Sequence, residues 1–139
     1  MEQPIFTDEQ KANLRRLAEA MRTGAQIRPQ ATGVLFRKQP ITIDNYQKME
    51  VCSCALGAAW EGAHPAFEAE RWVKVADDGD DGLVGLSDVE KYFGLNYHIT
   101  AINPVNGLNH EICGVIIDLN DSKNWTREAI ADWLLTLVQ

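Results

Sequence analysis

Two cysteines with one residue between them stand in the run "VCSCALGAAW", residues 51–60. With His110 and Cys113, Cys52 and Cys54 would offer zinc three sulfurs and one imidazole nitrogen. Structural zinc sites usually place about two to four residues between paired cysteines. Two helical positions two residues apart also project about 200° apart. Free cysteine packs as a small hydrophobic residue. We therefore expect no metal and no cofactor, with this zinc site as an alternative.

The same thiols offer a second chemistry, nucleophilic catalysis. A cysteine near a helix N-terminus has a lowered pKa, and His98 or His110 would serve as the base for Cys52 or Cys54. No cysteine-protease signature surrounds either thiol, and no phosphate-binding glycine loop is present. We expect no catalytic residue, and a cysteine-dependent enzyme is the alternative.

A third chemistry is calcium binding in the acidic run "DDGDDGLVGLSD", residues 77–88. On the twelve-residue calcium loop, Asp77, Asp81 and Asp88 take positions 1, 5 and 12. Position 3 is Gly79, which supplies no carboxylate, and the usual glutamate at position 12 is aspartate. The pattern favours a solvated acidic turn over a calcium site.

Charge is concentrated in the same region. The chain has a net charge of −7, and residues 61–90 hold nine acidic residues against Arg71 and Lys74. A basic footprint for nucleic acid is absent, so we expect no nucleic-acid partner. Of the four tryptophans, Trp72 lies beside this segment and is the one we expect to be exposed. The predicted binding surface consists of Trp72, Asp77, Asp78, Asp80 and Asp81.

These residues must be positioned by a fold that we predict to be mainly α, with α+β possible. We expect one globular domain over residues 1–139, with about five helices and a small β-hairpin near 33–43. Thr7 and Gln10 form a capping box for a helix over 8–23 that stops at Gly24. In the hairpin, "GVLFR" would pair with "ITI" across "KQP". The helix around the cysteines would be capped by Asp44 or would start near Ser53.

The second half is less uniform. Residues 66–76 fit a helix or a strand, and 112–119 also fit both, although the spacing of apolar residues over 105–121 favours a helix. Ser87 and Glu90 predict a capping box for a helix that stops at Gly94, and Thr126 predicts the N-cap of the last helix. We find no apolar run of 18 residues and no leader peptide, so we expect a protein of the host cell cytoplasm without membrane association.

Four pieces in order carry a resemblance: "LAEAMRTG…RPQATGVL", "CALGAAWE", "VEKYFGLN" and "LNDSKNWTREAIADWL". Together they resemble a group of small, largely uncharacterised phage and prophage proteins with a CxLG helix and a C-terminal "LND…T…IADWL" helix. The sharpest matches are residues 54–57 and 119–132. The resemblance implies a predominantly helical domain in a phage or mobile-element setting, and it supplies no catalytic residue.

These observations lead to one functional expectation. We expect a non-enzymatic accessory protein of a phage or mobile element that binds a host protein or a small ligand, with a role against host defence. A cysteine-dependent enzyme and a small zinc-stabilised module are the alternatives. The sequence leaves the oligomeric state open.

Overall fold

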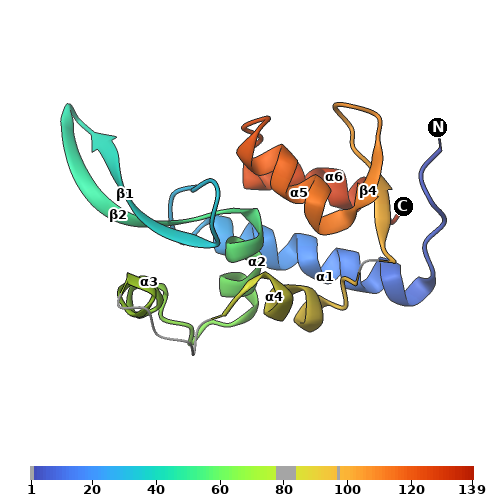
Figure 1. Ribbon diagram of the computed structural model, residues 1–139, viewed down its shortest axis with the longest axis horizontal. Helices are drawn as coiled ribbons and strands as arrows, with labels where there is room; N and C mark the ends of the chain where they lie inside the picture. The colour runs from blue at the N-terminus through green and yellow to red at the C-terminus, as the bar shows by residue number, and fades with distance from the viewer. Residues whose placement is uncertain (1, 78–83, 97) are drawn as a thin grey trace.

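The computed structural model describes residues 2–77, 84–96 and 98–139. It is mainly helical, with two antiparallel two-stranded hairpins, so the predicted fold class is confirmed (Figure 1). The elements in chain order are α1 Asp8–Ala25, β1 Phe36–Ile43, β2 Tyr46–Ser53, α2 Ala55–Ala63, α3 Ala69–Asp77, α4 Leu86–Phe93, β3 Thr100–Ile102, β4 Asn109–Glu111, α5 Ile112–Asp121 and α6 Arg127–Thr136.

Helix α1 is the longest helix in the described part of the chain, and α2, α4 and α6 pack on it. The predicted capping box is present: the Thr7 side chain accepts from the Gln10 backbone N–H, and the Gln10 side chain accepts from the Thr7 N–H. Its buried stripe includes Leu14, Leu17 and Met21, which belong to the main core together with residues of α2, α4, α5 and α6. These residues recur at helical spacing, so one face of α1 enters the core.

The sequence predicted that α1 stops at Gly24. The helix instead continues to Ala25, and Gly24 lies inside it at the crossing with α2. A Cβ at Gly24 would overlap the Ala58 carbonyl, and one at Gly62 would overlap the Ala20 carbonyl. Two glycines thus allow the backbones of α1 and α2 to touch. Gly57 has a related role, because its Cβ would overlap the Leu35 carbonyl in the segment leading to β1.

The first hairpin is longer than predicted and has a different turn. "KQP" lies inside β1, so "ITI" pairs with residues of β2 and not with "GVLFR". The turn is Asp44–Asn45, where both residues have positive φ, 48° and 73°, the backbone that a two-residue type I′ hairpin requires. Asp44 is therefore not a helix cap. Cys52 lies in β2, and α2 begins only after its N-cap residue, Cys54.

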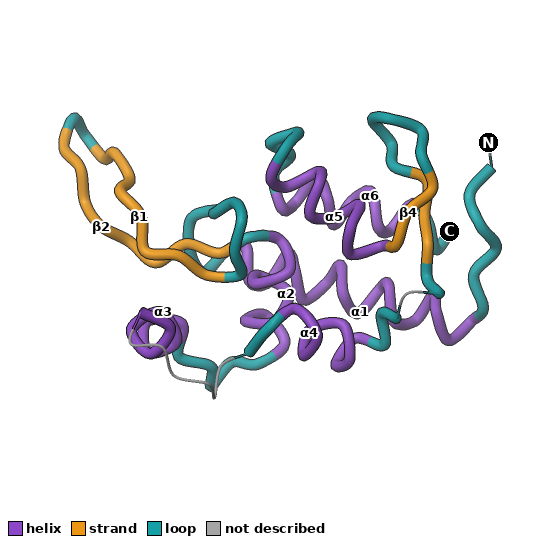
Figure 2. Tube along the Cα trace, viewed as in Figure 1, coloured by secondary structure: helices purple, strands orange, loops and turns teal. Residues whose placement is uncertain are grey.

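The β1–β2 hairpin forms an arm that extends beyond the helices (Figures 1 and 2). Its base packs on α3 in a small second cluster of Phe36, Val51, Ala69 and Val73. Residues 66–76, for which helix and strand were both open, thus contain a helix that supports the arm. The distal half of the arm has no such support, as its mostly exposed side chains show.

The remaining helix boundaries follow their caps. Helix α4 begins after Gly85, whose N–H donates to the Asp88 carboxylate at 2.7 Å, so the predicted Ser87 capping box is wrong. It ends as expected at Gly94, where φ is +69°. Residues 112–119 are helical, and Thr126 caps α6 by accepting from the Ala129 N–H. In the described part of the chain, no helix has the length and hydropathy to cross a membrane.

The α1–α2 contact generates the first prediction. Gly24→Ala should lower the free energy of unfolding by about 1–3 kcal/mol or more, because the added methyl forces two packed backbones apart. Gly114→Ala is the matched control, since a Cβ in this exposed part of α5 meets nothing within 4 Å. It should stabilise by about 0.5–1 kcal/mol. Urea unfolding measures both variants, and equal effects would contradict the close crossing.

Candidate functional site

The three cysteines are buried and unpaired. The Cys54 sulfur accepts a hydrogen bond from the Gly57 N–H at 3.4 Å. Burial raises the pKa of the Cys54 thiol and outweighs the opposite effect of the backbone N–H groups of Gly57 and Leu56. Burial likewise raises the pKa of Cys52, and it raises that of Cys113 to about 12. The helix N-terminus does not activate Cys54, contrary to the lowered pKa that the nucleophile hypothesis needs.

The predicted zinc and catalytic partners do not share a site. Cys54 lines a cavity between α2 and α5, whereas exposed His110, in β4, lines a different hollow together with Asp118. Among the described residues, no group of three or more cysteine, histidine or acidic side chains is placed to hold a metal ion. Cys52, Cys54, His110 and Cys113 are all described, so they form no common site. His98 precedes β3 and is exposed.

Only part of the predicted acidic binding surface belongs to the described residues. Asp78, Asp80 and Asp81 lie outside the described residues, and Asp77 is the last residue of α3. Trp72, expected to be exposed, is half-buried: its ring lies 5.5 Å from that of Phe36 and its Nε1 donates to the Val84 carbonyl. Of the predicted calcium ligands, Asp88 caps α4 by accepting from the Gly85 N–H, and Asp81 lies outside the described residues.

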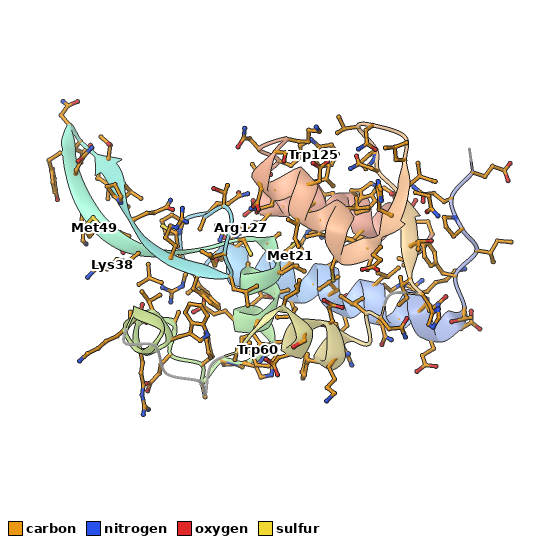
Figure 3. The ribbon with its side chains drawn as sticks, in the orientation of Figure 1. Met21, Lys38, Met49, Trp60, Trp125 and Arg127 are labelled. Atoms are coloured by element: carbon orange, nitrogen blue, oxygen red, sulfur yellow. The ribbon has the colours of Figure 1, made fainter. Side chains whose placement is uncertain are left out.

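A residue that no motif singled out occupies the centre of the molecule. Arg127, the first residue of α6, is 5% exposed, and its guanidinium lies where the arm joins the helices (Figure 3). It donates to five oxygens: the carbonyls of Ala25, Arg28, Pro29 and Ser53, and the Ser53 hydroxyl. Burial lowers the pKa of Arg127. One cation thereby ties α6 to the end of α1, to the following loop and to the end of β2.

An ion pair lies beside this junction. Arg28 binds the buried Glu61 carboxylate with two hydrogen bonds, of 2.7 and 2.8 Å, and also contacts Glu70 at 3.0 Å. Burial alone would lower the pKa of Arg28, but the two carboxylates outweigh it and raise the pKa. The pair connects the loop after α1 to α2 and α3, and the Arg28 carbonyl at the same time accepts from Arg127.

Asn120 forms the second node of the network and is 1% exposed. Its Oδ1 accepts from the Ala55 N–H at 3.0 Å and from the Gln30 amide at 2.9 Å. Its Nδ2 donates to the Ala31 carbonyl and to Asp121. Gln30 also donates to the Trp125 carbonyl. Asn120 thus fixes the loop before β1 against the start of α2 and the end of α5.

A cavity of about 190 Å³ opens beside Asn120. Its walls come from the loop before β1, the start of α2 and one face of α5, and they are mostly apolar. The lining residues are Gly33, Val34, Leu35, Cys54, Ala55, Leu56, Leu86, Ile116, Ile117, Asn120 and Asp121. The candidate site is therefore this cavity with the buried hydrogen bonds that hold its walls.

Comparison of the chain with protein-family models, with curated proteins and with solved structures finds no match. The network residues themselves fall in three of the four sequence pieces of the phage-protein resemblance. Arg28 and Gln30 stand in "RPQ", Cys54 and Glu61 in "CALGAAWE", and Asn120 and Arg127 in the last piece. No motif in the sequence identified the buried network, because its hydrogen bonds join residues that are far apart in the chain.

The Arg127 network generates the second prediction. Arg127→Met should lower the free energy of unfolding by more than about 3 kcal/mol, because the Ala25 and Arg28 carbonyls and the Ser53 hydroxyl lose their donor. Arg22→Met is the control: Arg22 forms an exposed ion pair with Asp132, and its loss should cost at most about 1 kcal/mol. Urea titration of both variants gives the difference. Similar losses would show that Arg127 is not the central tie.

The raised pKa of the Cys113 thiol generates the third prediction. Because the folded thiol has a pKa of about 12 against a reference of 9.0, the unfolded chain releases this proton first. The contribution of Cys113 to the free energy of unfolding should thus be constant below about pH 9 and fall by about 1.4 kcal/mol per pH unit between about pH 9 and 12. Cys113→Ala removes this contribution. Urea unfolding of both proteins at about pH 8, 10 and 11 measures it, and parallel pH profiles would contradict the burial effect.

Proposed function

We propose that this protein is a non-enzymatic binding protein that engages a partner protein through the distal half of the β1–β2 arm. The observation that carries the proposal is the exposure of large apolar side chains there. Ile43 is 41% exposed, Met49 53% and Tyr46 61%, on a hairpin that projects from the helices (Figure 3). Exposed apolar side chains that gather on one projection are typical of protein-binding surfaces.

The strand register supports a shaped surface. Ile43 lies opposite Tyr46 and Ile41 opposite Lys48, so the two isoleucines and the tyrosine share one face of the arm. Pro40 lies opposite Met49 on the other face. A partner with an apolar cleft would enclose the tip from both sides, with Tyr46 as the aromatic anchor.

The edge of the arm favours binding by side chains over strand addition. Ile43 and Tyr46 flank the two-residue turn as a hydrogen-bonded pair, and hydrogen-bonded and non-hydrogen-bonded pairs alternate along the two strands. Pro40 and Met49 are therefore a non-hydrogen-bonded pair, and the backbone nitrogen of Pro40 faces the outer edge of β1. Proline has no N–H to donate there, which blocks strand pairing. On β2, the exposed charge of Lys48 discourages the same reaction.

Charge favours a protein over a nucleic acid as the partner. Arg37, Lys38 and Lys48 on the arm are nearly balanced by Asp44 and Glu50, and the whole chain carries −7. Nucleic-acid arms need an excess of basic residues to bind phosphates. The resemblance to phage proteins supports a host protein as the partner and action against host defence as the role.

Site-specific photo-cross-linking tests the proposal. A benzophenone amino acid replaces Tyr46 in one variant and Tyr92, which is 43% exposed on α4, in the matched control. In host lysate, the variant at residue 46 should give a discrete protein adduct that the control lacks. Adding Ile43→Ser and Met49→Ser should reduce this adduct at least about tenfold, because the apolar contacts contribute most of the binding energy.

Three results would argue against the proposal. Identical adducts from positions 46 and 92 would indicate non-specific capture. An adduct with twice the mass of the chain would indicate that the partner is a second copy of this chain and not a host protein. No adduct at position 46 would remove the arm as the binding surface. Thermal unfolding of the serine variants checks that the arm substitutions leave the fold intact.

A further inference from the structure

We propose that the cavity beside Asn120 binds a small, neutral, apolar ligand of about single-ring size that carries one hydrogen-bond donor. This inference is independent of the arm, because no residue of β1 or β2 lines the cavity. It follows from three properties of the cavity: its fixed walls, its size and the carboxylate of Asp121 in its lining.

The walls of the cavity are held apart by contacts of the backbone. The Leu35 carbonyl accepts the Cys54 N–H at 3.0 Å, and Gly57 packs directly on that carbonyl. On the other side, Asn120 joins the Ala31 carbonyl to the Ala55 N–H. The loop before β1 therefore cannot move toward α5 without breaking buried hydrogen bonds. A cavity that is already formed binds its ligand without the cost of ordering its walls.

The size of the cavity restricts the ligand. Sites for drug-sized ligands and cofactors commonly measure about 300–1,000 Å³, whereas this cavity measures about 190 Å³. Apolar cavities of about 150 Å³ take up benzene. At its rim, Val34, Leu86 and Ile117 are each more than a third exposed, which leaves an apolar entrance.

The polar groups of the cavity define the ligand's chemistry. Asn120 is saturated, since its oxygen accepts two hydrogen bonds and its amide nitrogen donates two. The Cys54 sulfur accepts from Gly57. Asp121 uses Oδ1 to accept from Asn120, and no other described residue donates to its carboxylate. Because this carboxylate is the only charged group among the described lining residues, a donor on the ligand is favoured and an anion is excluded.

An NMR titration with phenol and toluene tests both parts of the inference. The two probes have nearly the same shape, and phenol carries the donor that toluene lacks. Each should shift the backbone amide signals of residues 33–35, 54–56 and 116–121 at concentrations up to about 10 mM. The amides beside Cys113 and those of the arm tip should not respond. Benzoate, which adds a negative charge, should cause no shift.

Substitution of Asp121 separates the donor contact from apolar binding. Asp121→Ala should weaken phenol at least about fivefold and change toluene less than about twofold. Asp121→Asn keeps the shape of the side chain, but its one oxygen already accepts from Asn120, so it should not restore the phenol affinity of the wild-type protein. Asn120 retains its bonds to Ala31 and Ala55 in both variants, so the walls stay in place.

The outcomes are distinct. No shift with either probe in the wild-type protein overturns the site. Shifts outside the cavity residues overturn its location. Equal effects of Asp121→Ala on phenol and toluene overturn the donor requirement. The arm proposal is unaffected by each of these results, because its cross-linking experiment uses no cavity residue.

Discussion

The structure depends on one buried cation. Among the described residues, the hydrogen-bond partners of the Arg127 guanidinium include no carboxylate: its two terminal nitrogens donate to four carbonyls and a hydroxyl, and its buried Nε has no partner. Those oxygens belong to three segments: the end of α1, the loop after it and the end of β2. A side chain with a planar set of donors can join them, whereas an apolar side chain of similar size cannot.

Arg127 also breaks a local rule. It is the first residue of α6, where the helix dipole disfavours a positive charge and where the sequence places Glu128 as the favourable partner. Its position is explained by the tertiary contacts and not by the helix. Burial lowers the pKa of Arg127; among its neighbours Glu128 opposes this most strongly, and Glu61 of the adjacent Arg28–Glu61 pair contributes less. The loop between α1 and β1 is therefore fixed from two sides, and its fixed course gives the cavity its wall.

The sequence predicted the elements whose signals are local. The caps at Thr7 and Thr126 and the stop at Gly94 depend on neighbouring residues alone, and they are confirmed. Gly24 was misread because a glycine near a helix end resembles a stop, while its real function requires α2, which is distant in sequence. The hairpin was misplaced for a similar reason: Asp44–Asn45 is a turn signal, but Asp44 followed by Gln47 also resembles a helix cap. Of the site, only Cys54 was singled out, since burial of Asn120 and Arg127 depends on contacts about 65 to 100 residues apart in the chain.

The separation of the two apolar clusters has a consequence for the energetics of the arm. Phe36, Val51, Ala69 and Val73 form a cluster apart from the main core, and half-buried Leu35 packs against both. The arm and α3 therefore constitute a unit of stability distinct from the helices around α1. Such a unit opens at a lower free energy than the whole molecule. The surface proposed to meet a partner thus belongs to the part of the protein that can rearrange during an encounter while α1, α2, α5 and α6 remain folded.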